Sequence, residues 1–223
     1  MKSENAYLVE RDRIRENLNQ YTRRAYQLLP GTDKPNILDI GCGSGVPTLE
    51  LARLSNGSIL AIDIDRELIE ILREKIDAAG LAHRIRAEAR SILDLDYPDQ
   101  SFDIVWAEGS VYVIGFRKGL SEWRRFIKPK GFLVVHDELK EMIGKLRAIP
   151  ECGYDLLDRF ELSADIWREE YYGPLEEHIR ALRKKYGGDP EMQKLIEKEE
   201  REIDWAKRNP ERCASVFFVM RKK

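Results

Sequence analysis

A glycine-rich segment constrains the fold of this chain more than any other feature. Residues 36–40 are rich in Ile and Leu, which is typical of a strand buried on both faces. Gly41, Gly43 and Gly45 follow at alternate positions, and glycine allows a tight turn and a close approach of the backbone to a ligand. Pro47 then suits the first turn of a helix. This order of strand, glycine turn and helix N-terminus is typical of nucleotide sites in α/β folds.

An acidic residue indicates which nucleotide this turn would bind. Asp39 stands two positions before Gly41, where a carboxylate would repel a pyrophosphate and attract an ammonium group. The glycines read G-x-G-x-G, whereas a dinucleotide-binding turn reads G-x-G-x-x-G and would need glycine in place of Val46. The sequence I-L-D-I-G-C-G-S-G therefore resembles the first motif of class I S-adenosylmethionine-dependent methyltransferases. The resemblance covers residues 36–136.

This resemblance implies a fold and a cofactor. The expected fold is a three-layer, Rossmann-like α/β fold with a seven-stranded, mostly parallel sheet whose last strand is antiparallel. The expected cofactor is S-adenosylmethionine, with S-adenosylhomocysteine as the product. The resemblance also implies that the cofactor contacts Asp39 and the turn residues Gly41, Cys42, Gly43 and Gly45.

The next expected strand, at 58–63, ends in a second acidic residue, Asp63. An acid roughly 20 residues beyond such a glycine turn can accept hydrogen bonds from ribose hydroxyls, because neighbouring parallel strands end at one edge. The resemblance implies this role for Asp63 and packing of Ile64 against adenine. It places the adenine edge at Ser91 and Ile92, after a strand at 85–89. Many family members have an acid in place of Ser91, so its hydroxyl or the backbone is expected to hold the adenine amino group.

Two further polar residues follow strands and are candidate catalytic groups. Glu108 comes after a strand at 102–106, and His136 ends a strand at 131–136. Because ligands of open α/β sheets bind outside the carboxyl ends of the strands, Glu108 is expected beside the sulfonium or the acceptor. His136 could titrate near neutral pH as a base. The alternatives are a surface cap for Glu108 and a capped strand end for His136.

The domain prediction is one methyltransferase domain, 1–223. It consists of an N-terminal helical lid (1–30), a core (31–162), a helical insert between the last two strands (163–210) and the final strand (211–223). The lid rests on one continuous helix at 5–29, for which the alternative is a helix that covers a sheet edge. Within the insert, Ser163 and Asp189 are expected helix starts, and Gly173-Pro174 is expected to interrupt the helix.

Aromatic residues are the candidate contacts to the methyl acceptor. Tyr112 lies in an apolar segment, and Trp167, Tyr171 and Tyr172 cluster near the start of the insert. Aromatic walls suit a planar or cationic ligand and exclude water. Plain packing is the alternative for all four.

The composition of the chain limits the kinds of molecule that it is expected to bind. Lys plus Arg is 38 and Asp plus Glu is 40, a net charge of −2 that argues against a dominant nucleic-acid surface. No apolar run approaches about 18 residues, so no membrane span is expected. The 3 cysteines include no C-x-x-C pair, which indicates no zinc site and disfavours metalloid methylation, since that chemistry needs clustered thiols. A cytoplasmic monomer or homodimer that acts on a small molecule is the simplest interpretation.

The predicted reaction is direct, SN2-type methyl transfer, which needs alignment and exclusion of water rather than a covalent nucleophile. One alternative is a protein that binds the cofactor or its product without catalysis. The other is an NAD-type oxidoreductase, which Asp39 and the missing third glycine disfavour.

Overall fold

A computed structural model describes residues 3–31, 33–186 and 188–223. Contacts divide the chain into two compact units. The sheet unit comprises Asn19–Glu161 and Val216–Lys223, and the helical unit comprises the chain up to Leu18 together with Leu162–Ser215. The insert expected at 163–210 therefore falls wholly within the helical unit, together with the first part of the N-terminal segment.

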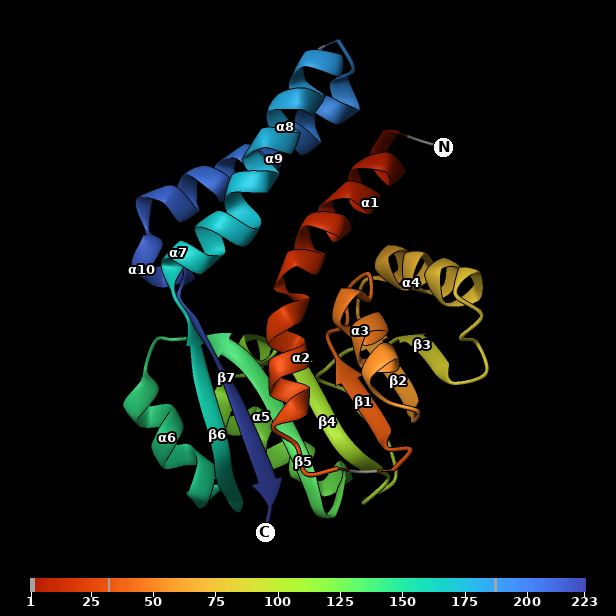
Figure 1. Cartoon of the computed structure of the whole chain (residues 1–223), viewed down its shortest axis with the longest axis vertical. Coiled ribbons are helices and arrows are strands. Elements are labelled where there is room, and N and C mark those ends of the chain that lie inside the picture. Colours follow the sequence, from red (N-terminus) through yellow and green to blue (C-terminus); the bar gives the residue numbers. More distant parts are fainter. Residues whose placement is uncertain (1–2, 32, 187) are drawn as a thin grey trace. The chain divides into compact units, whose positions relative to one another are not determined.

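The sheet unit is built on seven strands in the order β3-β2-β1-β4-β5-β7-β6, as Figure 1 shows. Strands β1 to β5 pair in parallel, and β7 runs in the opposite direction (Figure 1). This is the predicted mostly parallel sheet with an antiparallel last strand. The strands are β1 (Asn36–Ile40), β2 (Ser58–Asp63), β3 (Ile85–Ala89), β4 (Phe102–Glu108), β5 (Ile127–Glu138), β6 (Tyr154–Leu162) and β7 (Ser215–Lys222).

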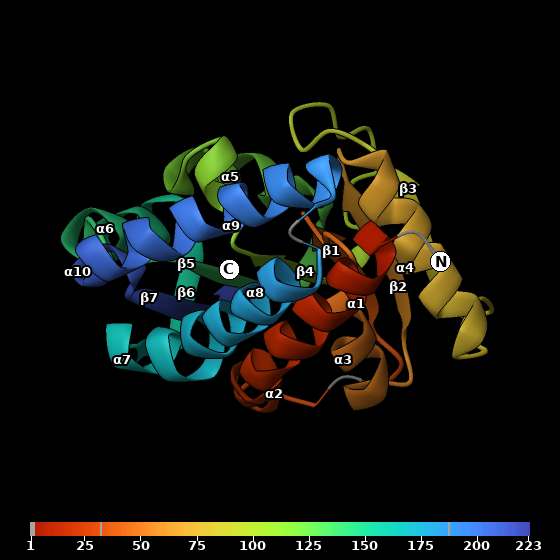
Figure 2. The ribbon, with the colours of Figure 1, turned by 90° about the horizontal axis from the view of Figure 1, so that it is seen from above.

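Helices cover both faces of this sheet, so the predicted three-layer architecture is confirmed. Figure 2 shows α5 and α6 on one face, and α2 and α3 on the other. The helical segments of this unit are α2 (Asn19–Gln27), α3 (Val46–Leu54), α4 (Arg66–Ala78), η2 (Val111–Val113), α5 (Phe116–Trp123), η3 (Arg124–Phe126) and α6 (Met142–Glu151).

The central position of β1 explains where a ligand site can form. Its apolar residues are completely buried because β2 and β4 flank it and helices cover both faces. The register sets Ile40 opposite Ile62 of β2, and Asp39 opposite Trp106 of β4. Consequently the glycine turn, which follows β1, lies at the same edge of the sheet as Asp63 and Glu108, which end β2 and β4.

The helical unit consists of α1 (Ser3–Arg15), η1 (Glu16–Leu18), α7 (Ala164–Trp167), the π-helical turn η4 (Arg168–Tyr172), α8 (Gly173–Lys185), α9 (Pro190–Arg208) and α10 (Pro210–Cys213). Helix α8 lies between α1 and α9 (Figure 2). The two expected helix starts are confirmed. Ser163 accepts a hydrogen bond from the Ile166 N–H, and Asp189 accepts from the first turn of α9.

Two helix predictions were wrong. The helix expected at 5–29 is broken by the 3₁₀ turn Glu16–Leu18, which coincides with the boundary between the two units. Gly173-Pro174 does not interrupt the insert, because the π-helical turn carries the chain directly into α8. Proline is tolerated there because it occupies the first turn of α8, where the N–H that it lacks would have had no hydrogen-bond partner within the helix.

Candidate functional site

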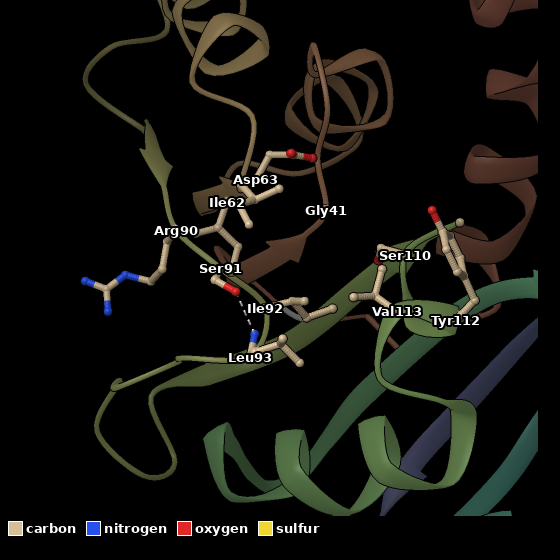
Figure 3. Close-up of a pocket in the computed structure, with 12 residues that line it drawn as sticks. Gly41, Ile62, Asp63, Arg90, Ser91, Ile92, Leu93, Ser110, Tyr112 and Val113 are labelled. Carbon is tan, nitrogen blue, oxygen red and sulfur yellow. Dashed lines mark hydrogen bonds between the residues drawn. The ribbon is translucent and has the colours of Figure 1, made fainter.

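A cavity of about 240 Å³ lies at the edge where the carboxyl ends of β1, β2 and β4 meet. Figure 3 shows the residues that line it. They come from the glycine turn, the end of β2, the segment after β3 and the segment after β4. The lining residues are Gly41, Ile62, Asp63, Ile64, Arg90, Ser91, Ile92, Leu93, Gly109, Ser110, Tyr112 and Val113.

Gly41 fits the turn for two reasons. Its φ of +76° lies in the left-handed region that favours glycine. A Cβ atom at Gly41 would also stand 2.3 Å from Cβ of Ser110. The Ser110 hydroxyl in turn donates a hydrogen bond of 2.6 Å to the Ile40 carbonyl oxygen. The end of β4 thus packs directly against the glycine turn and leaves no room for a side chain there.

Asp63 links the turn to the cavity. Its Oδ2 accepts a hydrogen bond of 2.8 Å from the Gly43 N–H, and its Oδ1 accepts one of 3.0 Å from the Asp65 N–H. A carboxylate offers about four acceptor positions, so these two bonds leave capacity for ligand hydroxyls. Asp63 is not the N-cap of α4, because Asp65 holds that position and accepts hydrogen bonds from the Glu67 and Leu68 N–H groups.

Asp39 lies behind the turn, outside the cavity lining. Its side chain is buried, and its Oδ2 accepts a hydrogen bond of 2.6 Å from the Thr48 hydroxyl. Burial raises the pKa of Asp39 to about 7, and the negative charges of Glu108 and Asp63 act in the same direction. The three carboxylates make this edge of the sheet electronegative.

Much of the cavity lining is apolar. Ile64, Leu93, Tyr112 and Val113 are each more than half exposed, and all four line the cavity. Exposed apolar groups gathered in this way mark binding grooves. Ser91 adds a hydroxyl to this lining, and its Oγ accepts a hydrogen bond of 3.2 Å from the Leu93 N–H (Figure 3).

The remaining turn residues support the site from behind and do not line the cavity. Cys42 is buried, and burial raises the pKa of its thiol. A Cβ at Gly45 would stand 2.1 Å from Cδ1 of Leu72, so this glycine lets α4 pack closely against the turn. Gly43 contributes its N–H to Asp63.

The two candidate catalytic residues also lie outside the cavity lining. Oε1 of Glu108 accepts hydrogen bonds from the Thr22 hydroxyl at 2.8 Å and from the Trp106 indole N–H at 2.9 Å. His136 is buried, and its ring stacks on Phe217 with centroids 4.1 Å apart and planes 3° from parallel. Glu108 is therefore held in place at the end of β4, whereas His136 contributes to packing.

The predicted acceptor residues fall into both units. Tyr112 lines the cavity and is 70% exposed. Trp167, Tyr171 and Tyr172 contact one another in the helical unit, with ring centroids 5.1 to 6.2 Å apart. The predicted aromatic cluster therefore exists, and its part in acceptor binding stays a prediction.

Sequence reasoning missed Ser110 and the position of Arg90. Ser110 comes directly after Glu108 and Gly109 at the end of β4, and this position was the signal in the sequence that could have identified it as a residue of the site. Arg90 lines the cavity, but its guanidinium points away from it (Figure 3) and lies over Tyr97, 5.1 Å from the ring centroid.

Within the described residues there is no group of three His, Cys, Asp or Glu side chains that could hold a metal ion. Among the helices of the same residues, none has the length and apolar character needed to span a bilayer.

Comparisons with known proteins agree with this geometry. Residues 37–131 match a family model described as a methyltransferase domain. A relative from Amycolatopsis mediterranei, 27-O-demethylrifamycin SV methyltransferase, is 30% identical over 127 residues, which cover 56% of this chain and 47% of that protein. The chain spans about half the length of the first curated relatives it matches.

Solved structures show the same fold. An S-adenosylmethionine-dependent methyltransferase from Geobacter sulfurreducens, in complex with S-adenosylhomocysteine, superposes with a TM-score of 0.73 at 15% identity, covering 93% of this chain and 91% of that one. The [4+2]-cyclase SpnF superposes with a TM-score of 0.76 at 20% identity, covering 92% of this chain and 81% of that one.

The fold and the site define a Rossmann-like α/β domain with a glycine turn at its ligand edge. Residues 37–131 are similar to a methyltransferase domain, and the relatives and solved structures that the chain resembles include S-adenosylmethionine-dependent methyltransferases.

Proposed function

We propose that the chain is a methyltransferase that uses S-adenosylmethionine and acts on a small-molecule acceptor. The observation that carries this proposal is the hydrogen bond between Gly43 and Asp63, which fixes a glycine turn and an acceptor carboxylate beside one cavity. The relatives named as small-molecule methyltransferases support the same class of reaction for this chain.

The residues that line the cavity fit the cofactor. Asp63 would accept hydrogen bonds from the ribose hydroxyls with the positions that its two N–H partners leave open. Ile64 and Ile92 would pack against adenine, and the Ser91 hydroxyl would meet its amino group. The absence of a side chain at Gly41 lets the backbone itself approach the ligand.

The charge at this edge supports a cationic ligand over a dinucleotide. Burial raises the pKa of Asp39, and the negative charges of Glu108 and Asp63 raise it further. A bound ammonium or sulfonium group would offset this repulsion, whereas a pyrophosphate would add to it. We therefore favour S-adenosylmethionine over NAD.

When bound, the cofactor supplies a methyl group that is activated by a sulfonium for direct SN2-type transfer. The chain would contribute alignment and exclusion of water. Glu108 is the proposed neighbour of the sulfonium, because two hydrogen bonds orient its carboxylate at the end of β4. His136 is the weaker candidate, since its ring is buried in the stack with Phe217. Tyr112, at the exposed side of the cavity, is the proposed acceptor contact within the sheet unit.

A protein that binds the cofactor without methylating anything is the second candidate. The observation that favours it is that Glu108 and His136, the two candidate catalytic residues, both lie outside the lining of the cavity.

Calorimetric titration tests the binding step. We expect S-adenosylhomocysteine to bind the wild-type chain and NAD to give no heat. Asp63→Ala should weaken binding by about 1.5–3 kcal/mol, the usual range for hydrogen bonds to a charged group. Asp96→Ala removes an exposed carboxylate outside the cavity and serves as the control. Equal affinity of both variants would reject the assignment of Asp63.

Turnover separates the two candidates. Formation of S-adenosylhomocysteine from S-adenosylmethionine, measured against a panel of small hydroxyl, amine and activated-carbon acceptors, is expected for at least one acceptor. Tight binding of the cofactor with no turnover across the panel would favour the non-catalytic candidate.

A further inference from the structure

A second cavity lies wholly within the helical unit. It measures about 330 Å³ and is enclosed by α7, the π-helical turn η4, the start of α8, the end of α9 and α10. Helix α10 contacts both α7 and α9, which closes this side of the unit. The cavity shares no lining residue with the cavity beside the glycine turn. Its size is at the lower end of the range of about 300–1,000 Å³ that small-molecule sites occupy.

The walls of this cavity are fixed by specific contacts. The π-helical turn places Tyr172 in the wall, and a Cβ at Gly173 would stand 2.8 Å from the Arg168 carbonyl oxygen. The Cys213 thiol contacts the Ala206 and Asn209 carbonyl oxygens at 3.8 and 3.7 Å, which holds α10 against α9. A π-helical turn within an α-helical segment is rare and is frequently found at functional sites.

The charged groups at the rim neutralise one another. Nη1 of Arg168 lies 3.1 Å from Asp165, and Nζ of Lys207 lies 2.6 Å from Glu176. These are the four charged side chains of the described lining, so the rim offers neither a free cation for an anionic ligand nor a free carboxylate for a cationic one.

The rest of the lining is uncharged and mostly apolar. It is formed by Ala164, Tyr172, Gly173, Ala206, Pro210 and Cys213. Burial raises the pKa of the Tyr172 hydroxyl and of the Cys213 thiol, so both groups are neutral at physiological pH. They add two weak polar contacts to a surface that otherwise favours apolar groups.

We infer that the helical unit carries its own binding site for an uncharged, largely apolar organic molecule. The site binds its ligand by burial of apolar surface against Tyr172 and the small side chains around it, with the paired charges at the entrance. It does not rest on the proposed methyl transfer, and it gives Tyr172 a role that Trp167 and Tyr171, which lie outside the lining, do not share.

N-phenyl-1-naphthylamine, an uncharged apolar dye whose fluorescence rises on burial, is the probe. We expect saturable binding to the full chain that excess S-adenosylhomocysteine does not reduce. Ala164→Trp should abolish this binding, because Ala164 is half-buried in the cavity wall and a larger side chain would fill the space. Ala181→Trp places the same side chain on an exposed position of α8 and should leave binding unchanged.

Alkylation of cysteines gives a second measurement that needs no variant. N-ethylmaleimide modification, followed by mass spectrometry, should be slowed at Cys213 by the dye, whereas Cys42 and Cys152 are buried elsewhere in the chain. Three results would each overturn the inference: no saturable binding, displacement of the dye by S-adenosylhomocysteine, or binding with no protection of Cys213. S-adenosylhomocysteine is also titrated into the Ala164→Trp and Ala181→Trp variants. Its binding tests the proposed function, whereas binding of the dye tests this site, so the failure of one is distinguished from the failure of the other.

Discussion

The backbone N–H of Gly43 donates a hydrogen bond of 2.8 Å to Oδ2 of Asp63. The other carboxylate oxygen of Asp63 accepts from the Asp65 N–H at 3.0 Å. One side chain at the end of β2 therefore orients both the glycine turn after β1 and the start of α4. The geometry of the cavity depends on both carboxylate oxygens of this residue.

Substitution of Asp63 by asparagine tests this dependence. The amide would turn its NH₂ group towards one of the two N–H donors, so one of the two hydrogen bonds is lost. We expect Asp63→Asn to reduce the free energy of unfolding by about 1–3 kcal/mol and to weaken binding of S-adenosylhomocysteine. Urea unfolding and calorimetric titration measure the two effects.

The same substitution two positions later is the matched control. Asp65 accepts hydrogen bonds from Glu67 and Leu68 through one oxygen, Oδ1, which an asparagine also offers. Since Asn and Asp are nearly equal as N-cap residues, Asp65→Asn should change stability by less than about 0.5 kcal/mol. Equal losses in the two variants would show that the contacts of Asp63 carry no special weight.

The contact between Gly41 and Ser110 allows a test by paired substitutions. Gly41→Ala should be strongly destabilising, because its Cβ would meet Cβ of Ser110 at 2.3 Å and because φ is +76°. Adding Ser110→Gly removes the steric clash but not the backbone strain, so the double variant should recover part of the lost stability. Urea unfolding of the two single variants and the double variant gives the coupling. Additive losses would mean that the close approach does not limit the turn.

Local sequence patterns predicted the helices and strands that position the site, but they could not predict contacts between residues that are far apart in the sequence. The apolar run before the glycines identified β1, and the acid after the next run identified Asp63, because both signals lie within a few residues. The hydrogen bond of Ser110 to Ile40 joins residues 70 positions apart, and no local pattern encodes it. The burial of Asp39 behind the turn likewise depends on Thr48 in the following helix.

The insert shows the same limit. Its helix starts at Ser163 and Asp189 were predictable from side chains that cap locally. The continuous path through Gly173-Pro174 was not, because the same two residues that commonly end a helix here fit a π-helical turn. Gly173 meets the Arg168 carbonyl closely and has no side chain to clash with it.

A buried ion pair at the end of β5 leads to a stability prediction. Nζ of Lys145 lies 2.6 Å from Oδ2 of Asp137, and the two side chains are 10% and 7% exposed. Lys145→Met would leave a buried carboxylate without its cation and should cost about 3–5 kcal/mol. The exposed pair Arg117–Glu151 provides the control, since Arg117→Met should cost no more than about 1 kcal/mol. Similar midpoints for the two variants in urea unfolding would contradict the prediction.

The protonation state of Asp39 should affect both the stability of the chain and its affinity for the cofactor. Burial raises its pKa from the ordinary 3.8 to about 7, so the folded chain binds this proton more tightly than the unfolded chain does. The stabilisation from this group is therefore present below pH 4 and is lost as the pH rises towards 7. A cationic ligand near the carboxylate acts in the opposite sense, because it favours the ionised form.

Affinity for S-adenosylhomocysteine, which retains the ammonium group, should consequently rise with pH and level off above about 7. At one pH unit below the pKa, Asp39 is mostly protonated, and affinity should be about tenfold lower than on the plateau. Binding near pH 6 should also release a proton, which titrations in buffers of different ionisation enthalpy detect. Asp39→Asn keeps an oxygen for the Thr48 hydroxyl but has no proton to lose, so its affinity should be weaker and flat between pH 5.5 and about 8. The same pH curve in Asp39→Asn and the wild type would assign the titration to another group and remove Asp39 from cofactor binding.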